Sequence, residues 1–247
     1  MNRSHIDGCR YRASSSSRAP GSLQACQRAR GPRILGLDPE AALRLILAST
    51  SPYRRALLER LGLPFTAVAP PFGEVAPEPG ADPARVVTKN ALGKALSVLP
   101  DHPDSLVIGS DQVAVCGAEI LTKPGTPERA VEQLLRLAGR EHRLVTAVAV
   151  LFSPPAGAAA EGGTRGDHAV VENRLQMRPL TRAEAEAYVR REQPLDCAGS
   201  YKSEGLGVTL FERMEGEDPT AIVGLPLIAL SRLLRRFAVD PLRPAAG

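Results

Sequence analysis

Short apolar runs alternate along this chain with segments that open on a helix-start signal, and this alternation limits the fold more than any other feature. The run Leu43–Ala48 precedes Ser51-Pro52, where a hydroxyl N-cap and a proline at the first helical position begin a predicted helix. Asp82-Pro83 and Thr126-Pro127 repeat the signal. Strands that alternate with helices are typical of α/β domains. We therefore predict a single α/β domain on a mixed β-sheet over residues 41–247.

The same patterns give the bounds of the other elements. Strands are predicted at Phe65–Ala69, at Leu106–Val115 with an interruption at Gly109–Gln112, at His142–Phe152, at His168–Met177, and as a strand pair over Gly199–Phe211. Helices are predicted from Pro83 to about Val98, from Pro127 to Gly139, from Thr181 (which forms a capping box with Glu184) to about Arg191, and over Pro226–Phe237. Loops are predicted at Pro70–Asp82 and 153–167.

Residues 1–40 show neither the period of a strand nor that of a helix. They contain seven Arg and three acidic residues, so this segment accounts for the whole net charge of +4. We predict a disordered basic extension or a segment added by too early a start site. An Arg-rich, acid-poor leader also resembles a transit peptide, although no amphipathic stripe supports that interpretation.

The basic extension raises the alternative of a nucleic-acid binder. The remaining 207 residues are electrically balanced, and the chain has four Tyr, five Phe and no Trp for base stacking. We therefore expect no nucleic-acid partner. The long apolar stretch Leu144–Phe152 is too short for a membrane helix, which needs about 20 residues, so we expect no membrane partner either.

The four cysteines, at positions 9, 26, 116 and 197, form no C-x-x-C pair, and no histidine lies at zinc-ligand spacing from them. This pattern excludes a typical structural zinc site. Scattered cysteines in a chain of this length are typical of free thiols in a reducing compartment. We therefore predict a cytoplasmic protein.

Polar side chains gather where the predicted elements end. Residues 49–55 read Ser-Thr-Ser-Pro-Tyr-Arg-Arg between a strand and a helix start, which favours an anion site; a capped helix with surface arginines is the alternative. Asp111 follows an apolar run, and an Asp at the end of a buried strand is a frequent catalytic or metal-binding residue in α/β folds. The alternative is that Asp111 is a turn residue. Residues 196–205 are dense in Gly and polar residues, which indicates a close approach to a ligand or a structural bend.

Taken together, these segments resemble the Maf family of nucleotide pyrophosphatases. The matching motifs occur in the family's order: the run Leu45–Leu58, then Ser110-Asp111-Gln112-Val113, Lys123-Pro124, Cys197–Gly205 and Gly224-Leu225-Pro226-Leu227. The resemblance covers about residues 43–241. Gln112 and Ser203-Glu204-Gly205 are similar to the branch of the family that acts on 7-methyl-GTP.

The resemblance implies a mixed-sheet fold related to the inosine triphosphate pyrophosphatases, a homodimer, and a divalent metal, Mg²⁺ or Mn²⁺. It implies hydrolysis of a nucleoside triphosphate to a monophosphate and pyrophosphate, in the removal of modified nucleotides. The alternative is a non-catalytic nucleotide-binding regulator of cell division.

The resemblance also assigns roles by motif. Asp111 would be catalytic and would hold the metal with Glu74; Ser49, Ser51, Arg54, Arg55, Lys94 and Lys123 would bind phosphates; and Tyr53, Gln112 and Glu204 would select the base. Two positions depart from the family's pattern. Tyr53 stands where the branch usually has Trp, and Gly73 stands where an acidic residue usually precedes Glu74.

Overall fold

The computed structural model describes residues 43–152, 154 and 164–243. All described elements lie between Arg44 and Arg236. The predicted basic extension 1–40 lies outside the described residues, as does most of the predicted loop 153–167.

Seven strands form one mixed sheet in the order β2-β1-β3-β5-β6-β7, with β4 paired to β3. The strands are β1 (Arg44–Ala48), β2 (Phe65–Val68), β3 (Ser105–Cys116), β4 (Glu119–Leu121), β5 (Glu141–Phe152), β6 (Arg165–Met177) and β7 (Phe211–Gly216). β1 pairs in parallel with β2 and β3, and the other pairings are antiparallel. The predicted α/β fold on a mixed sheet is confirmed.

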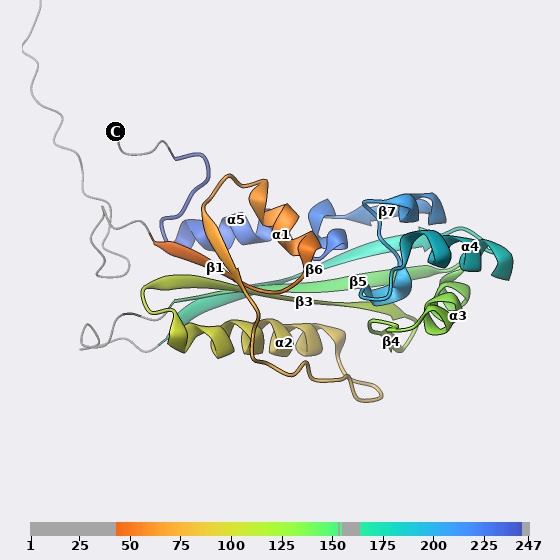
Figure 1. The fold of residues 1–247 in the computed structure, drawn as a ribbon, viewed down its shortest axis with the longest axis horizontal. Helices are drawn as coiled ribbons and strands as arrows, with labels where there is room; N and C mark the ends of the chain where they lie inside the picture. Colours follow the sequence, from red (N-terminus) through yellow and green to blue (C-terminus); the bar gives the residue numbers. More distant parts are fainter. Residues whose placement is uncertain (1–42, 153, 155–163, 244–247) are drawn as a thin grey trace, which may run out of the picture. The chain divides into compact units, whose positions relative to one another are not determined.

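Helices cover both faces of this sheet (Figure 1). They are α1 (Pro52–Glu59), α2 (Pro83–Val98), α3 (Pro127–Leu137), α4 (Arg182–Glu192) and α5 (Leu227–Arg236), with 3₁₀ turns η1 (Leu99–Asp101), η2 (Ala198–Ser200), η3 (Leu206–Leu210) and η4 (Pro219–Val223). α2 packs on one face against β3 and β5, whereas α5 and η4 pack on the other. Among the described helices, none combines the length and apolar character that a membrane crossing requires.

Four of the helix starts follow from local side-chain bonds. Ser51, Asp82, Thr126 and Thr181 each accept a hydrogen bond from a backbone N–H two or three residues further on, which satisfies a donor of the first turn. The predicted capping box of Thr181 is present in full. These predictions were correct because the interactions lie within a few residues of sequence.

Two predicted elements were wrong. β3 runs without a break from Ser105 to Cys116, so Asp111 lies inside a strand and not at its end. The predicted strand pair over Gly199–Phe211 is instead a series of turns with η2 and η3, and β7 begins only at Phe211. The short strand β4 was not predicted.

The middle of β3 lacks a neighbouring strand on one side. β1 pairs with β3 up to Ile108, and β4 pairs with β3 from Ala114 onward. Among the described strands, β5 alone therefore lies beside Gly109–Val113. Because successive side chains of a strand point to opposite faces, this uncovered stretch can offer groups to both faces at one opening.

Candidate active site

A cavity of about 490 Å³ opens at the uncovered stretch of β3. Its walls come from the end of β1, the start of α1, the loop before α2, β3, η2 and η4. All of the predicted site residues except Arg55 line it: Ser49, Ser51, Tyr53, Arg54, Glu74, Lys94, Asp111, Gln112, Lys123 and Glu204. The fold thus brings together side chains that lie up to 155 residues apart (49 to 204) in the sequence.

Two carboxylates and two ammonium groups meet on the α2 side of the cavity. Nζ of Lys94 lies 2.7 Å from Oδ1 of Asp111 and 2.8 Å from Oε1 of Glu74. Nζ of Lys123 lies 3.1 Å from the same Glu74 oxygen. Burial alone would raise the pKa of Glu74, but Lys94 and Lys123 outweigh it and lower that pKa to about 2. Glu74 is therefore ionised at neutral pH.

The sequence analysis missed Asn90, which holds the other oxygen of Asp111. Its Nδ2 donates to Oδ2 of Asp111 at 3.0 Å, and its amide also bonds the backbone N–H and C=O of Val75. Asn90 thereby ties the loop that carries Glu74 to the strand that carries Asp111. It lies one helical turn before Lys94 on α2, and this spacing could have identified it.

A close contact places the Glu74 loop against α2. The ring of Phe72 lies on Gly93, where a Cβ atom would come within 2.3 Å of the ring carbons. Any other residue at position 93 would therefore displace Phe72, and with it the loop that carries Glu74.

The start of α1 forms the opposite wall of the cavity. Oγ of Ser49 accepts from the N–H of Ser51, and Oγ of Ser51 accepts from the N–H of Arg54. Nε of Arg54 donates to the carbonyl oxygen of Gly224 at 2.9 Å, and burial lowers the pKa of this guanidinium. Arg55 points elsewhere, since its Nε donates to Glu59 on the exposed side of α1.

Gln112 faces the side of the sheet away from Asp111. Its Nε2 lies within hydrogen-bond distance of three acceptors: Oγ1 of Thr146 at 2.9 Å and the carbonyl oxygens of Ala221 and Ile222 at 2.6 and 3.3 Å. Oγ1 of Thr146 donates to the same Ala221 oxygen. The amide nitrogen of Gln112 is therefore engaged in holding η4 against the sheet.

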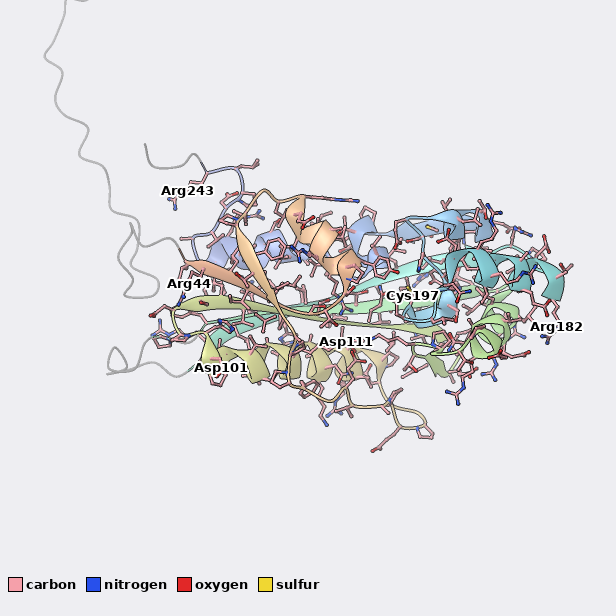
Figure 2. All side chains as sticks on the ribbon, in the orientation of Figure 1. Arg44, Asp101, Asp111, Arg182, Cys197 and Arg243 are labelled. Carbon is pink, nitrogen blue, oxygen red and sulfur yellow. The ribbon has the colours of Figure 1, made fainter. Side chains whose placement is uncertain are left out.

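The remaining wall carries Tyr53 and the segment 196–204. Nζ of Lys202 lies 5.7 Å from the centroid of the Tyr53 ring, within the range of a cation–π contact. Cys197, which is labelled in Figure 2, is another of the residues that line the cavity. Burial, together with Asp196, raises the pKa of Cys197 to about 12, so its thiol stays protonated at neutral pH and is a poor nucleophile.

The charged side chains of the cavity bear on how it could hold an anion. Arg54, Lys94 and Lys123 supply three positive charges, and Glu74, Asp111, Asp196 and Glu204 supply four negative ones, so the lining carries one net negative charge. A bound polyphosphate would add to this negative charge, so it would require a cation as well as Arg54 and Lys123. The first-turn N–H groups of α1 offer further stabilisation to an anion.

The two carboxylates also fit a divalent cation. Asp111 Oδ1 and Glu74 Oε1 already converge on one positive centre, the Nζ atom of Lys94. Mg²⁺ is commonly held by one or two carboxylates together with substrate phosphates and water. Among the residues that the structure describes, no cluster of three or more His, Cys, Asp or Glu side chains is arranged for a metal.

The sequence is similar to known proteins over most of its length. The family model described as Maf-like protein matches residues 44–237. A 7-methyl-GTP pyrophosphatase of Bordetella avium is 48% identical over 200 residues, which cover 81% of this chain and 96% of that protein. A protein of the same name from Aromatoleum aromaticum is 50% identical over 192 residues, which cover 78% and 94% of the two chains.

Similarity to solved structures is slight. The Staphylococcus aureus Ham1 protein is 16% identical with a TM-score of 0.35, over 53% of this chain and 71% of that one. A nucleoside-triphosphatase, described as a dITP/XTP pyrophosphatase, from Mycobacterium abscessus is 19% identical with a TM-score of 0.31, over 61% and 96% of the two chains.

Proposed function

Because the chain belongs to the Maf family, we propose that it is a nucleoside triphosphate pyrophosphatase whose preferred substrate is 7-methyl-GTP. One observation carries the proposal. Asp111, Glu74, Lys94, Lys123 and Arg54 line a single cavity, so phosphate-binding cations and a carboxylate able to accept a proton face the same space. The names of the relatives support the choice of base.

The polyphosphate would lie between two walls of the cavity. Arg54 and the start of α1 contact it from one side, and Lys123 from the other. Holding both ends of the phosphate chain orients the α-phosphorus for in-line attack and lowers the entropic part of the barrier. Cationic side chains then stabilise the charge that develops on the leaving pyrophosphate.

Asp111 would act on the attacking water. One carboxylate oxygen accepts the proton as the water oxygen bonds to the α-phosphorus and the bond to the β-phosphate oxygen breaks. Asn90 and Lys94 fix the orientation of this carboxylate. A divalent cation held by Glu74 and Asp111 would supply Lewis-acid stabilisation of the phosphate charge when bound.

A panel of triphosphates tests the proposal. Purified protein is incubated with 7-methyl-GTP, GTP, ATP, UTP and dTTP, with Mg²⁺, Mn²⁺ or a chelator, and pyrophosphate and monophosphate are measured. We expect metal-dependent release with the highest kcat/KM for 7-methyl-GTP. Binding of nucleotide without pyrophosphate release would instead support a non-catalytic regulator.

The same purified protein tests the predicted assembly and the predicted compartment. We propose a homodimer, which sedimentation or light scattering would detect as twice the mass of the chain. We also propose that the protein acts in the cytoplasm, which fractionation of the source cells would check.

A further inference from the structure

Asn173 on β6 is buried with an unpaired amide. Its side chain is 1% exposed, and neither Nδ2 nor Oδ1 has a hydrogen-bond partner within the described part of the chain. Leaving both groups of an amide unsatisfied costs free energy that an apolar residue would not cost. A ligand that enters from outside the chain could supply the partners that this amide lacks.

Asn173 differs in its hydrogen bonding from the other polar side chains on the same face of the sheet. Gln112 on β3 lies opposite Thr146 on β5, and Thr146 lies opposite Val171 on β6. Asn173 follows Val171 by two residues and therefore points to the same face of the sheet. Gln112, Thr146 and Asn173 thus share one face. Gln112 and Thr146 both donate to carbonyl oxygens of η4. Asn173 makes no such bond.

Asn173 lines a second cavity, of about 290 Å³, that adjoins the first. The two cavities share Glu204, Ile222 and Val223 in their walls. Gly216 of β7 leaves room for the amide, since a Cβ atom there would lie 1.6 Å from Oδ1 of Asn173. Glu204 therefore stands where a ligand could pass from one cavity into the other.

We propose that Asn173 is a specificity-determining residue that reads a guanine base together with Glu204, with the base in the second cavity and the phosphates in the first. The inference rests on the proposed function and extends it. The Asn173 amide offers one donor and one acceptor side by side, which match O6 and N1–H of guanine. The Glu204 carboxylate accepts from the exocyclic N–H₂ group next to them.

This pair of side chains discriminates between bases. Adenine also matches the Asn173 amide after a flip of the amide, but it offers no donor to Glu204. Uracil, thymine and cytosine place their O2 oxygen toward the Glu204 carboxylate, so two acceptors would face each other. Methylation at N7 leaves the guanine edge that faces the two residues unchanged.

Asn173→Leu tests the inference, since leucine has a similar size and no polar atom. We expect the ratio of kcat/KM for 7-methyl-GTP to that for UTP to fall about 5- to 150-fold, the range for a lost pair of base contacts. The unfolding temperature should not fall, because the amide has no protein partner to lose. Gln176→Leu, an amide on the same strand outside both cavities, is the matched control and should keep the ratio.

Asn173→Asp gives a second measurement, because it keeps the shape and replaces the donor with an acceptor that opposes O6. We expect it to lower the same ratio. An unchanged ratio in both variants would overturn the inference. A wild-type protein that releases no pyrophosphate from any triphosphate would overturn the proposed function instead. In that case the Kd of 7-methyl-GTP, measured by calorimetry, still tests whether Asn173 contacts the base. A Kd that Asn173→Leu leaves unchanged would overturn this role.

Discussion

Nζ of Lys94 lies 2.7 Å from Oδ1 of Asp111, and both side chains are more than nine-tenths buried. The same ammonium group contacts Glu74, so a single lysine from α2 links a carboxylate of the central strand to a carboxylate of a loop. This bridge sets the geometry of the reacting end of the cavity, and the first three predictions concern it.

Asp111→Asn removes the group that accepts the proton of the attacking water. We expect kcat to fall about 10²- to 10⁴-fold, the usual contribution of general base catalysis, while nucleotide binding survives. Pyrophosphate release measures the first quantity and calorimetry the second. Near-normal turnover would refute the base and metal roles of Asp111.

Lys94→Met leaves the buried Asp111 carboxylate without its cation. Removing one partner of a buried ion pair typically lowers the free energy of unfolding by about 3–5 kcal/mol, and we expect a loss of this order in urea unfolding. Lys89→Met is the matched control, since Lys89 is exposed on the same helix and should change stability little. Equal stability of the two variants would contradict the bridge.

Glu74 should make the stability of the protein depend on pH in the acid range. Its folded pKa of about 2 lies below the ordinary value of 4.5, so its contribution is present above pH 4.5 and is lost as the pH falls toward 2. We expect the difference in unfolding free energy between wild type and Glu74→Gln to shrink over that window. A difference that stays constant from pH 6 to pH 2 would show that the Lys94 and Lys123 contacts do not act on Glu74.

Arg54 and Arg55 are adjacent in sequence but should differ in function. Arg54 lines the cavity, whereas Arg55 pairs with Glu59 outside it. Losing a charge-assisted hydrogen bond of about 1.5–3 kcal/mol should raise KM about 10- to 150-fold in Arg54→Ala. Arg55→Ala should change KM less than threefold by comparison. Equal effects would restore the phosphate role that the sequence motif assigns to both arginines.

Glu204→Gln should shift preference away from guanine nucleotides. The neutral amide retains one acceptor in place of a charged carboxylate, so the exocyclic N–H₂ group is bound less strongly. We expect kcat/KM for 7-methyl-GTP to fall at least about fivefold relative to UTP. An unchanged substrate profile in the triphosphate panel would remove Glu204 as a selector.

The sequence predicted most of the fold because most element bounds depend on local chemistry. The caps Ser51, Asp82 and Thr126 bond within three residues, so their effect is visible in the sequence itself. The interruption predicted in β3 was wrong for the opposite reason. Ser110 is tolerated inside a buried strand because its hydroxyl lies within hydrogen-bond distance of two carbonyl oxygens. These belong to Ala147 on β5 and to Gly224, 37 and 114 residues away in the sequence.

The sequence predicted only part of the site, because some of its residues act through contacts between distant parts of the chain. The family resemblance identified the charged residues at the centre of the first cavity, and it also assigned Arg55, which does not line that cavity. It did not identify Asn90 or Asn173. The role of Asn90 depends on its contact with Asp111, and that of Asn173 on a missing contact. Neither fact is visible before the strands and helices are placed together.

The uncovered stretch of β3 separates two tasks within one strand. Asp111 contacts Lys94 of α2 on one face of the sheet, while Gln112 contacts η4, two residues of which line both cavities, on the other. If the proposed roles hold, substitutions on β6 or in the segment around Glu204 would change which nucleotide is bound and leave the contacts among Asp111, Lys94 and Glu74 intact. A fold of this kind allows substrate preference to diversify, because residues that contact the base can change while the residues around Asp111 stay the same.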